Sequence, residues 1–352
     1  MKAAVVEGYN NINYIDIPEP QICSGHVKVA VKYCGICGSD IPRVLNGTCH
    51  SFPQVLGHEF SGVITEIAND VKNVSIGDHV VGIPLVPCFE CSDCKNGNFS
   101  QCNNYSFIGS RQQGAMAEYV VIPERNVLKI DPSIPFEHSA FFEPSTIALH
   151  GILLTQFHPG PNDYVIILGG AGCIGLFTTQ WCKLLGANKV VVIGRDRKRL
   201  AIAKEYGADY TFSTLDEDYI NQALRLTGEK GYAYVFDAAG TETSICAGLS
   251  LAANKSRMCM IGTPTQQLSF SVKTWEIINR KEMILTGSWM SYSAPWPGKE
   301  WIMTNDAVVK GTLKIDRNMI HMIGSLKDVK NIFKYIEDKP SNIKGRILLR
   351  IE

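Results

Sequence analysis

The sequence lacks net charge, long apolar runs and repeats. Its 34 lysines and arginines balance 34 aspartates and glutamates over 352 residues, so no net field attracts nucleic acid or an anionic bilayer. A long uncharged window, Tyr164–Cys182, contains four glycines, which disfavours a membrane span. The opening residues MKAAVVEGYN lack the apolar stretch of a signal peptide and are typical of a first strand. These absences favour an enzyme acting on a small molecule, with neither nucleic acid nor membrane as partner.

The length and the cysteine content narrow the class further. A chain of 352 residues is too long for one ordinary core and predicts two domains. Twelve cysteines without an export signal indicate reduced thiols and metal ligands rather than a disulfide framework. We therefore expect a cytoplasmic protein.

The predicted pattern of secondary structure changes twice along the chain. Residues 1–146 alternate short β-branched runs with Gly, Pro and Asn, which predicts a strand-rich domain. Residues 147–287 alternate strand and helix patterns, as in VIILGG, GLFTTQWCKLLG and KVVVIG, which predicts a parallel sheet. Residues 288–352 are too short for a core of their own and end in a predicted strand, GRILLRIE, so we assign them to the first domain. The expected class is α/β with a doubly wound parallel sheet.

Four thiols lie close together in the stretch PCFECSDCKNGNFSQC. A C-x2-C-x2-C-x7-C spacing lets one loop surround a tetrahedral zinc ion, and the four thiolates leave no position for a substrate. This predicts a structural zinc held by Cys88, Cys91, Cys94 and Cys102. An iron–sulfur cluster is the main alternative, although no proline follows the last cysteine. A nucleic-acid-binding zinc ribbon would need a more basic loop.

A second group of metal-binding side chains is spread over three segments. CGICGSD, GHEFSG and FFEPSTIALH contain a thiol, a hydroxyl, an imidazole and carboxylates. One thiolate, one neutral imidazole and one carboxylate cancel the charge of zinc and leave a fourth position open, so such a zinc remains a Lewis acid. Taken singly, the histidine would be interpreted as an ordinary turn residue and the cysteine as a small buried hydrophobic residue. Taken together, and in a chain with a zinc loop, these residues are better interpreted as metal ligands. The candidate residues are Cys37, Ser39, Asp40, His58, Glu59 and Glu143.

These segments carry a family resemblance. GHEFSGVITEIANDV and GICGSD resemble the zinc signature and the first-ligand motif of medium-chain alcohol and polyol dehydrogenases, over essentially the whole chain. The resemblance implies a GroES-like β-rich catalytic domain plus a Rossmann domain, two zinc ions per chain, and a homodimer or homotetramer. It maps the catalytic zinc to Cys37, His58 and Glu143, with Glu59 able to take a ligand position, and a proton-relaying hydroxyl to Ser39.

Other segments are similar to the polyol-phosphate branch of this family. PLVPCFECSDC, SQCNNYSFIGSRQQGAMAEY and GSWMSYSAPWPGKEW look like the dehydrogenases of that branch that act on galactitol phosphate. The resemblance implies oxidation of galactitol 1-phosphate to tagatose 6-phosphate. A neutral polyol or secondary-alcohol dehydrogenase is the enzyme alternative, and a non-catalytic dinucleotide-binding protein is the alternative from another class.

A glycine-rich turn follows the first predicted strand of the second domain. Gly170, Gly172 and Gly175 form a G-x-G-x-x-G pattern together with Cys173 and Ile174, inside a strand–helix–strand unit. In such a turn the glycines permit the tight bend, the approach of the pyrophosphate and the close packing of helix and strand. The helix N-terminus then faces the phosphates. The pattern predicts binding of a nicotinamide dinucleotide.

The next predicted strand ends without the acidic residue that would bind the ribose of NAD. KVVVIG closes with Gly194 and continues RDRKR. Arg195 is suited to bind a 2′-phosphate, and its basic neighbours add positive potential, so NADP is favoured over NAD. Asp196 keeps NAD as the alternative, or simply begins a solvated helix. The basic neighbours are Arg197, Lys198 and Arg199.

The pocket for the substrate phosphate is the least defined. Arg111 follows the SFIGS segment and Lys299 follows the aromatic WPG turn, and either can bind phosphate or be solvated. Tyr292 can line the pocket. For this tyrosine and for Trp289 and Trp296, packing is the favoured interpretation.

Overall fold

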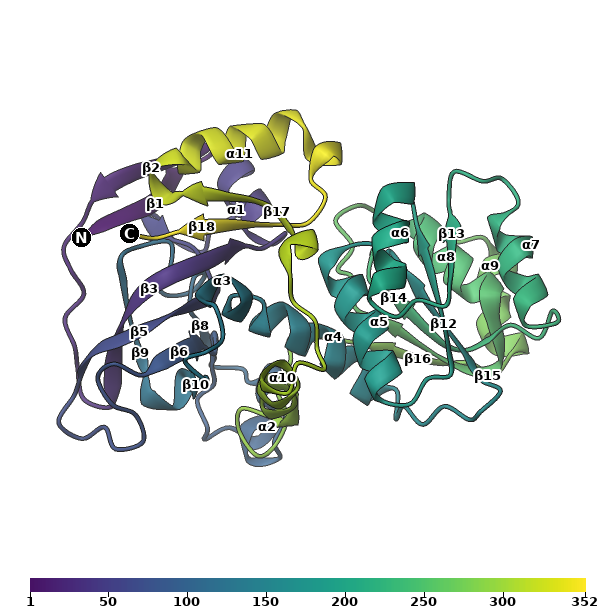
Figure 1. Ribbon diagram of the computed structural model, residues 1–352, viewed down its shortest axis with the longest axis horizontal. Coiled ribbons are helices and arrows are strands. Elements are labelled where there is room, and N and C mark those ends of the chain that lie inside the picture. The colour runs from purple at the N-terminus through teal and green to yellow at the C-terminus, as the bar shows by residue number, and fades with distance from the viewer. The chain divides into compact units, whose positions relative to one another are not determined.

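The computed structural model describes all 352 residues, which form two compact units (Figure 1). The first unit comprises residues 1–143, 292–310 and 315–352, and the second comprises residues 144–291 and 311–314. The second unit thus begins at Pro144 rather than at residue 147, ends at Ser291 rather than at residue 287, and includes a short later segment. No helix is long and apolar enough to cross a bilayer.

The first unit is built on strands. A seven-stranded sheet has the order β10-β6-β5-β3-β18-β17, with β9 also paired to β3; smaller sheets have the orders β2-β1-β4 and β7-β8. The strands are β1 (Lys2–Gly8), β2 (Asn11–Asp16), β3 (His26–Ile36), β4 (Gln54–Val55), β5 (Glu59–Ile67), β6 (His79–Gly82), β7 (Leu85–Val86), β8 (Ser106–Phe107), β9 (Tyr119–Pro123), β10 (Val127–Lys129), β17 (Ile320–Ser325) and β18 (Arg346–Arg350).

The C-terminal strand completes the main sheet of this unit. β18, the strand expected from GRILLRIE, pairs antiparallel with β3, and Figure 1 shows these yellow and purple segments side by side. The helices of the unit are α1 (Asp40–Leu45), α2 (Ser92–Lys95), α3 (Phe136–Ser139), α10 (Lys299–Val309) and α11 (Val329–Asp338), with short 3-10 turns at 99–101, 124–126, 317–319, 326–328 and 340–342. The core therefore joins residues from both ends of the chain.

Helix α11 shows why its segment folds onto the sheet. Val329, Ile332, Phe333 and Ile336 recur at helical spacing and are all buried in the core of the first unit. This apolar stripe packs into a core that also contains residues from the beginning of the chain, such as Val5, and α11 contacts β2.

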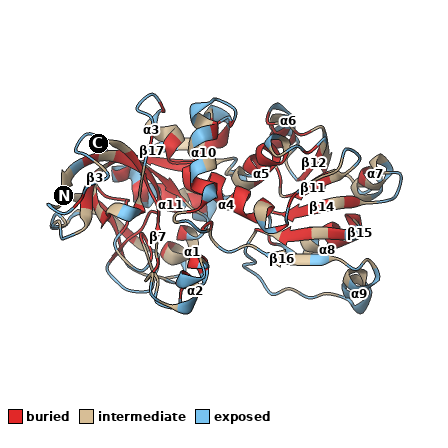
Figure 2. Cartoon of the chain, turned by 90° about the horizontal axis from the view of Figure 1, so that it is seen from below, coloured by how far each residue is buried: buried red, intermediate tan, exposed pale blue.

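The second unit is a parallel six-stranded sheet in the order β13-β12-β11-β14-β15-β16. Figure 2 shows buried residues along its central strands, whose apolar runs are covered on both faces. Its strands are β11 (Tyr164–Leu168), β12 (Lys189–Gly194), β13 (Tyr210–Ser213), β14 (Tyr232–Asp237), β15 (Ala252–Met260) and β16 (Ile284–Gly287). Its helices are α5 (Cys173–Leu184), α6 (Arg197–Glu205), α7 (Tyr219–Leu226), α8 (Glu242–Leu251) and α9 (Val272–Arg280); α4 (Phe142–Leu154) begins at the unit boundary.

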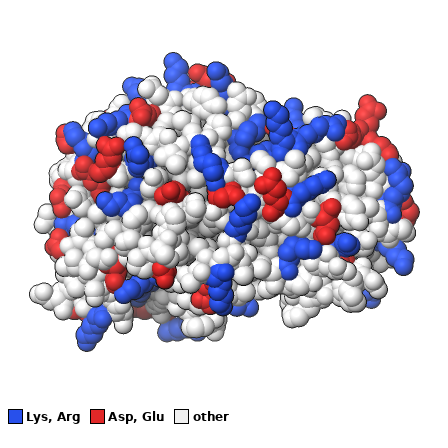
Figure 3. All heavy atoms as spheres, in the orientation of Figure 1, with Lys and Arg blue, Asp and Glu red and all other residues white.

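The strand order decides where a nucleotide binds in this unit. The chain runs outward from β11 through β12 to β13 and then returns to β14 on the other side of β11. Ligands of such sheets bind at the carboxyl ends of the strands where the order reverses, and the turn after β11 lies at that point. The predicted α/β class with a doubly wound parallel sheet is confirmed. On the surface, acidic and basic side chains are interspersed over the face drawn in Figure 3.

Candidate active site

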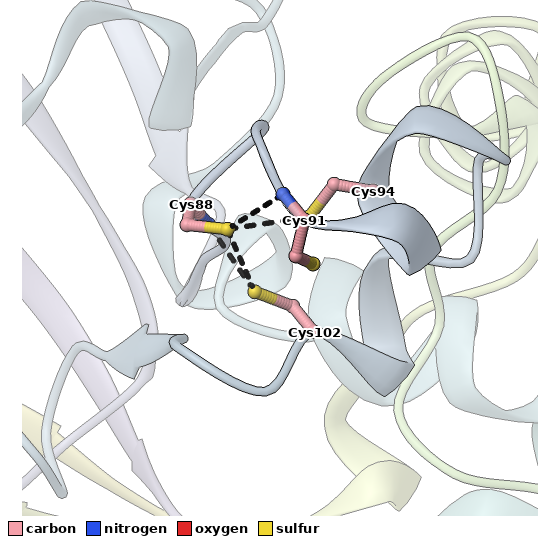
Figure 4. A group of neighbouring side chains, drawn as sticks. All are labelled: Cys88, Cys91, Cys94 and Cys102. Atoms are coloured by element: carbon pink, nitrogen blue, oxygen red, sulfur yellow. Dashed lines mark hydrogen bonds between the residues drawn. The ribbon is translucent and has the colours of Figure 1, made fainter.

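The loop after β7 brings its four cysteines together (Figure 4). Their sulfur atoms lie within 4.8 Å of one another; Sγ of Cys88 lies 3.5 Å from Sγ of Cys102 and 4.0 Å from Sγ of Cys94. A tetrahedron with zinc–sulfur bonds of about 2.3 Å has sulfurs about 3.8 Å apart. The four thiols therefore fit one zinc ion, and a fully thiolate-bound zinc is structural.

Backbone amides and burial act in opposite directions on these thiols. Backbone hydrogen bonds, from Glu90 and then Cys91, lower the pKa of Cys88 to about 6, and the amide of Cys91 lies 3.4 Å from Sγ of Cys88. Burial raises the pKa of Cys94 to about 12 and also raises that of Cys102. Because burial opposes two of the four thiolates, a bound cation is needed to keep all four ionised.

A second group gathers where β3 ends and β5 begins. Cys37 directly follows β3, His58 directly precedes β5, and Glu59 is the first residue of β5. One ligand atom from each lies within 4.8 Å of the others. The antiparallel pairing of β3 and β5, with Gly35 opposite Glu59, brings these distant residues together. A Cβ on Gly35 would lie 2.5 Å from Oε2 of Glu59, so the glycine makes room for the carboxylate.

Two further residues support this group from behind. Oδ2 of Asp40 accepts a hydrogen bond of 3.0 Å from the amide of Cys37, and its Oδ1 lies 3.7 Å from Nδ1 of His58. Nε of Arg346 lies 3.0 Å from Oε2 of Glu59, and its Nη1 donates to the carbonyl of Ile36. A carboxylate that accepts a ring N–H orients a histidine that binds a metal; Asp40 faces Nδ1 of His58 from that direction, at a distance longer than a hydrogen bond. Sequence reasoning missed Arg346, which no local motif marks.

The chemistry of this group fits a divalent cation. Burial, followed by the charge of Glu59, raises the pKa of the Cys37 thiol. Nδ1 of His58 and Oδ1 of Asp40 are buried without a hydrogen bond. A thiol, an imidazole and a carboxylate that converge in a buried place suit zinc with one coordination position left open.

Glu143 lies at the edge of this group. It is the second residue of α4 and is buried; burial and then the charge of Glu59 raise its pKa to about 7. Its carboxylate is not among the atoms within 4.8 Å of one another, which come from Cys37, His58 and Glu59. The assignment of Glu143 as the third ligand therefore stays a prediction, and Glu59 is in place to serve.

The hydroxyl of Ser39 lies next to the metal-binding group in the chain. Ser39 precedes α1 without using its side chain as a cap. Its Oγ accepts a hydrogen bond of 2.9 Å from Nη1 of Arg43, which also donates to the Ser39 carbonyl. Because Arg43 can only donate, the proton of the hydroxyl stays available to another acceptor.

The glycine-rich turn lies between β11 and α5. A Cβ on Gly175 would lie 2.3 Å from Cα of Gly170, and a Cβ on Gly170 would lie 2.7 Å from Cγ1 of Val192. Gly172 is exposed, and only the carbonyl of Gly169, at 3.4 Å, would approach a Cβ there. Gly170 and Gly175 are thus required for close packing, whereas Gly172 leaves space on the exposed side of the turn. Cys173 and Ile174, partly exposed, begin the helix.

The residues after β12 divide into solvent-exposed and structural ones. Arg195 and Lys198 are exposed, directly after Gly194, whose Cβ would lie 3.0 Å from Cβ of Ala171. Asp196 is the N-cap of α6 and accepts a bond of 3.0 Å from the Arg199 amide.

Arg199, expected to add positive potential near the ribose, is buried. Its Nε donates to the carbonyl of Ala171 at 3.1 Å, so it braces the glycine-rich turn.

Comparisons with known proteins identify the family. Residues 23–132 match the alcohol dehydrogenase GroES-like domain, and residues 173–302 match the zinc-binding dehydrogenase family. The chain is 36% identical to galactitol 1-phosphate 5-dehydrogenase of Escherichia coli (strain K12), over 84% of each protein. The chain belongs to the zinc-dependent medium-chain dehydrogenases. The predicted family, its GroES-like domain and its Rossmann domain are confirmed.

Other relatives of this dehydrogenase act on related molecules. D-arabitol-phosphate dehydrogenase of Enterococcus avium is 32% identical over 88% of this chain and 86% of that protein. D-xylulose reductase A of Aspergillus oryzae is 29% identical over 95% of this chain and 92% of that protein. The shared reaction type makes this chain an oxidoreductase of the alcohol and polyol dehydrogenase kind.

Solved structures resemble this dehydrogenase over nearly its whole length. Galactitol-1-phosphate dehydrogenase from Escherichia coli has a TM-score of 0.93 with 35% identity, covering 99% of this chain and 100% of that one. A zinc-binding dehydrogenase from Sinorhizobium meliloti 1021, bound to NADP, has a TM-score of 0.87 with 27% identity over 99% and 98%. A short chain alcohol dehydrogenase from E. coli CFT073, complexed with NADH, has the same score and identity over 99% of each chain.

The expected substrate residues of the dehydrogenase lie in different settings. Arg111 is exposed and lies over the ring of Tyr105, 4.5 Å from its centroid. Lys299 is exposed at the start of α10. Tyr292 is buried, its hydroxyl accepts a bond of 3.1 Å from the Leu85 amide, and its ring stacks on Trp296, which makes it a packing residue. Trp289 is half exposed.

Proposed function

We propose that this dehydrogenase oxidises a secondary hydroxyl of a polyol phosphate with a nicotinamide cofactor, and that galactitol 1-phosphate, converted to tagatose 6-phosphate, is its substrate. The observation that carries the reaction type is the convergence of Cys37, His58 and Glu59 into one buried set of donors. The phosphate ester is supported by two relatives whose names state that they act on galactitol 1-phosphate and arabitol phosphate.

The residues have separate roles in this mechanism. Cys37, His58 and either Glu59 or Glu143 would hold the catalytic zinc, which would supply the Lewis acidity that favours loss of a proton from the C5 hydroxyl. Ser39 accepts that proton and passes it outward. The backbone of the glycine-rich turn binds the pyrophosphate of the cofactor, which takes up the hydride in the overall reaction. Cys88, Cys91, Cys94 and Cys102 would hold a second zinc, and their loop would then be fixed by four thiolate ligands.

NADP(H) is the proposed cofactor, with NAD(H) as the alternative. The proposal is supported by the exposed Arg195 and by the engagement of Asp196 as a helix cap, which leaves its Oδ1 bonded to an amide rather than to a ribose. A 2′-phosphate suits an arginine because the planar guanidinium binds two phosphate oxygens at once.

A neutral polyol is the second candidate substrate, since D-xylulose reductase A is among the relatives. A non-catalytic role is disfavoured because ligand atoms of Cys37, His58 and Glu59 converge, and the hydroxyl of Ser39 follows Cys37 two residues later.

The dehydrogenase is proposed to assemble as a homodimer or homotetramer. β16 is an edge strand of its sheet, and the same unit exposes Val272, Trp275 and Ile284. An uncovered edge with apolar neighbours favours pairing with a second copy.

The deciding experiment measures turnover of galactitol 1-phosphate, arabitol phosphate, galactitol and sorbitol with NAD and with NADP, before and after treatment with a chelator. We expect the highest kcat/KM for a polyol phosphate with NADP, and loss of turnover on chelation. Preference for sorbitol would select the neutral-polyol alternative, and turnover that survives complete removal of zinc would refute the mechanism.

A further inference from the structure

Three basic residues lie on segments near the proposed metal group and have no role in the proposed mechanism. Arg43 is in α1, His50 is in the loop after it, and Arg111 follows β8. Arg43 contacts Ser39 directly, with Nη1 2.9 Å from Oγ. The carbonyl of Arg43 lies 3.5 Å from Sγ of Cys49, which ties the residue before His50 to α1.

Hydrogen bonds join the loop of His50 to the loop of Arg111. Nε2 of Gln54 donates to the carbonyl of Gln112 at 2.9 Å, and Nε2 of Gln113 donates to the carbonyl of Pro53 at 3.3 Å. The amide of Arg111 donates to the Phe107 carbonyl at 2.9 Å.

The Phe107 ring connects these loops to the metal group. It lies edge-on to the ring of His58, with centroids 5.5 Å apart. Arg43 therefore contacts a neighbour of Cys37 in the chain, and the loops of His50 and Arg111 are linked through Phe107 to His58, all within the first unit.

The positive charges of Arg43 and Arg111 affect the protonation of His50. Burial, and then the charges of Arg111 and Arg43, lower the pKa of His50. Oδ1 of Asp40 lies 3.6 Å from Nη1 of Arg43 and offsets part of its charge, whereas the side chain of Arg111 contacts Tyr105 rather than a carboxylate. The Arg111 guanidinium carries five N–H groups, and its contact with the Tyr105 hydroxyl, at 3.3 Å, uses one of them. Arg43, His50 and Arg111 together thus carry a net positive charge, and most N–H groups of Arg111 remain available to a ligand.

We propose that Arg43, His50 and Arg111 form a subsite for the phosphate group of the substrate, a phosphomonoester. This inference rests on the proposed function, because it names how a polyol phosphate is distinguished from a neutral polyol. The oxidised carbon of galactitol 1-phosphate and its phosphate lie toward opposite ends of the carbon chain, so the phosphate needs donors beside the metal group rather than in it. Guanidinium groups bind phosphate oxygens in pairs, and the imidazole adds a further donor.

The test compares Arg111→Ala and His50→Gln with the wild type. Arg43 is left unchanged because it also contacts Ser39. The measured quantity is the ratio of kcat/KM for galactitol 1-phosphate to that for galactitol. We expect this ratio to fall by about 10- to 100-fold in Arg111→Ala, as for the loss of a charged hydrogen bond, and by less in His50→Gln. Lys72→Ala, which removes an exposed charge from the same unit, is the matched control and keeps the ratio.

The kinetic results overturn the subsite if Arg111→Ala loses activity equally with both substrates or loses none. They also overturn it if the ratio falls in Lys299→Ala alone. Binding of inorganic phosphate, measured by calorimetry in the wild type and in Arg111→Ala, separates this inference from the proposed function. If the wild type turns over no polyol phosphate, the proposed function fails, whereas phosphate binding that is weakened in Arg111→Ala still supports the subsite. Equal phosphate binding by the two proteins, or none by the wild type, refutes it.

Discussion

Substitution by alanine at two glycines of the glycine-rich turn is expected to affect different properties: stability at Gly175 and cofactor affinity at Gly172. In Gly175→Ala the new methyl would lie 2.3 Å from Cα of Gly170 and 2.7 Å from the carbonyl oxygen of Gly169. Carbon atoms in contact are about 3.5–4.0 Å apart, so helix α5 and the turn must separate by more than an ångström. Such overpacking costs about 1–3 kcal/mol. At about 2–4 °C per kcal/mol for a unit of this size, the melting temperature of the second unit should fall by about 2–12 °C.

Gly172→Ala should leave the fold intact and weaken cofactor binding. Gly172 has φ −81° and ψ 174°, which any residue adopts, and the nearest atom to its added methyl would be 3.4 Å away. Its free energy of unfolding should therefore change by less than about 0.5 kcal/mol, as for other substitutions outside packed sites. The methyl would occupy the open side of the turn, where the pyrophosphate is proposed to lie. We expect affinity for the dinucleotide to fall more than tenfold, or about 1.4 kcal/mol.

The assays are thermal unfolding of the cofactor-free proteins and fluorescence titration with NADPH and NADH. Cofactor-free protein is needed because a bound nucleotide would raise the melting temperature by mass action. The packing argument is refuted if Gly175→Ala melts like the wild type. The proposed position of the pyrophosphate is refuted if Gly172→Ala binds both nucleotides normally.

Three more substitutions test the metal groups. Cys91→Ser removes one of four thiolates and should lower zinc content by one ion per chain and stability by several kcal/mol, less than the roughly 10–16 kcal/mol of small zinc domains; full zinc content with an unchanged melting temperature would contradict this. Cys37→Ser should abolish turnover in a folded protein that still binds the nucleotide, so near-normal turnover would reject the site. Gly35→Ala should displace the carboxylate of Glu59, because its Cβ would lie 2.5 Å from Oε2. It should weaken binding of the catalytic zinc by about 10–100-fold, the usual effect of a disturbed ligand support, as measured by competition with a chelator; unchanged zinc affinity would show that Glu59 is not held by this contact.

The parts of the site that lie close together in the sequence could be predicted from it. The four cysteines of the loop fall within one short segment, so their spacing alone indicated a tetrahedral site, and their sulfurs do lie within 4.8 Å of one another. The glycine-rich turn could also be predicted locally, because the atoms that leave no room for a side chain at Gly175 belong to the same strand–turn–helix unit. The alternation of strands and helices likewise predicted the parallel sheet, since period and length of apolar segments reflect burial.

Residues that act across strands could not be predicted in this way. The ion pair of Glu59 with Arg346 joins β5 to the last strand of the chain, and it exists only because β18 and β5 both lie beside β3. Sequence spacing likewise gave no sign that Arg199 would brace the carbonyl of Ala171.

The sequence by itself determined which donors the protein has, the local turns that carry them and the family to which the chain belongs. Only the tertiary structure decided which carboxylate lies beside Cys37 and His58, and that Arg346 pairs with this carboxylate. The physical reason is that ligand type is a property of single side chains, whereas distance between donors depends on strand pairing between segments far apart in the chain.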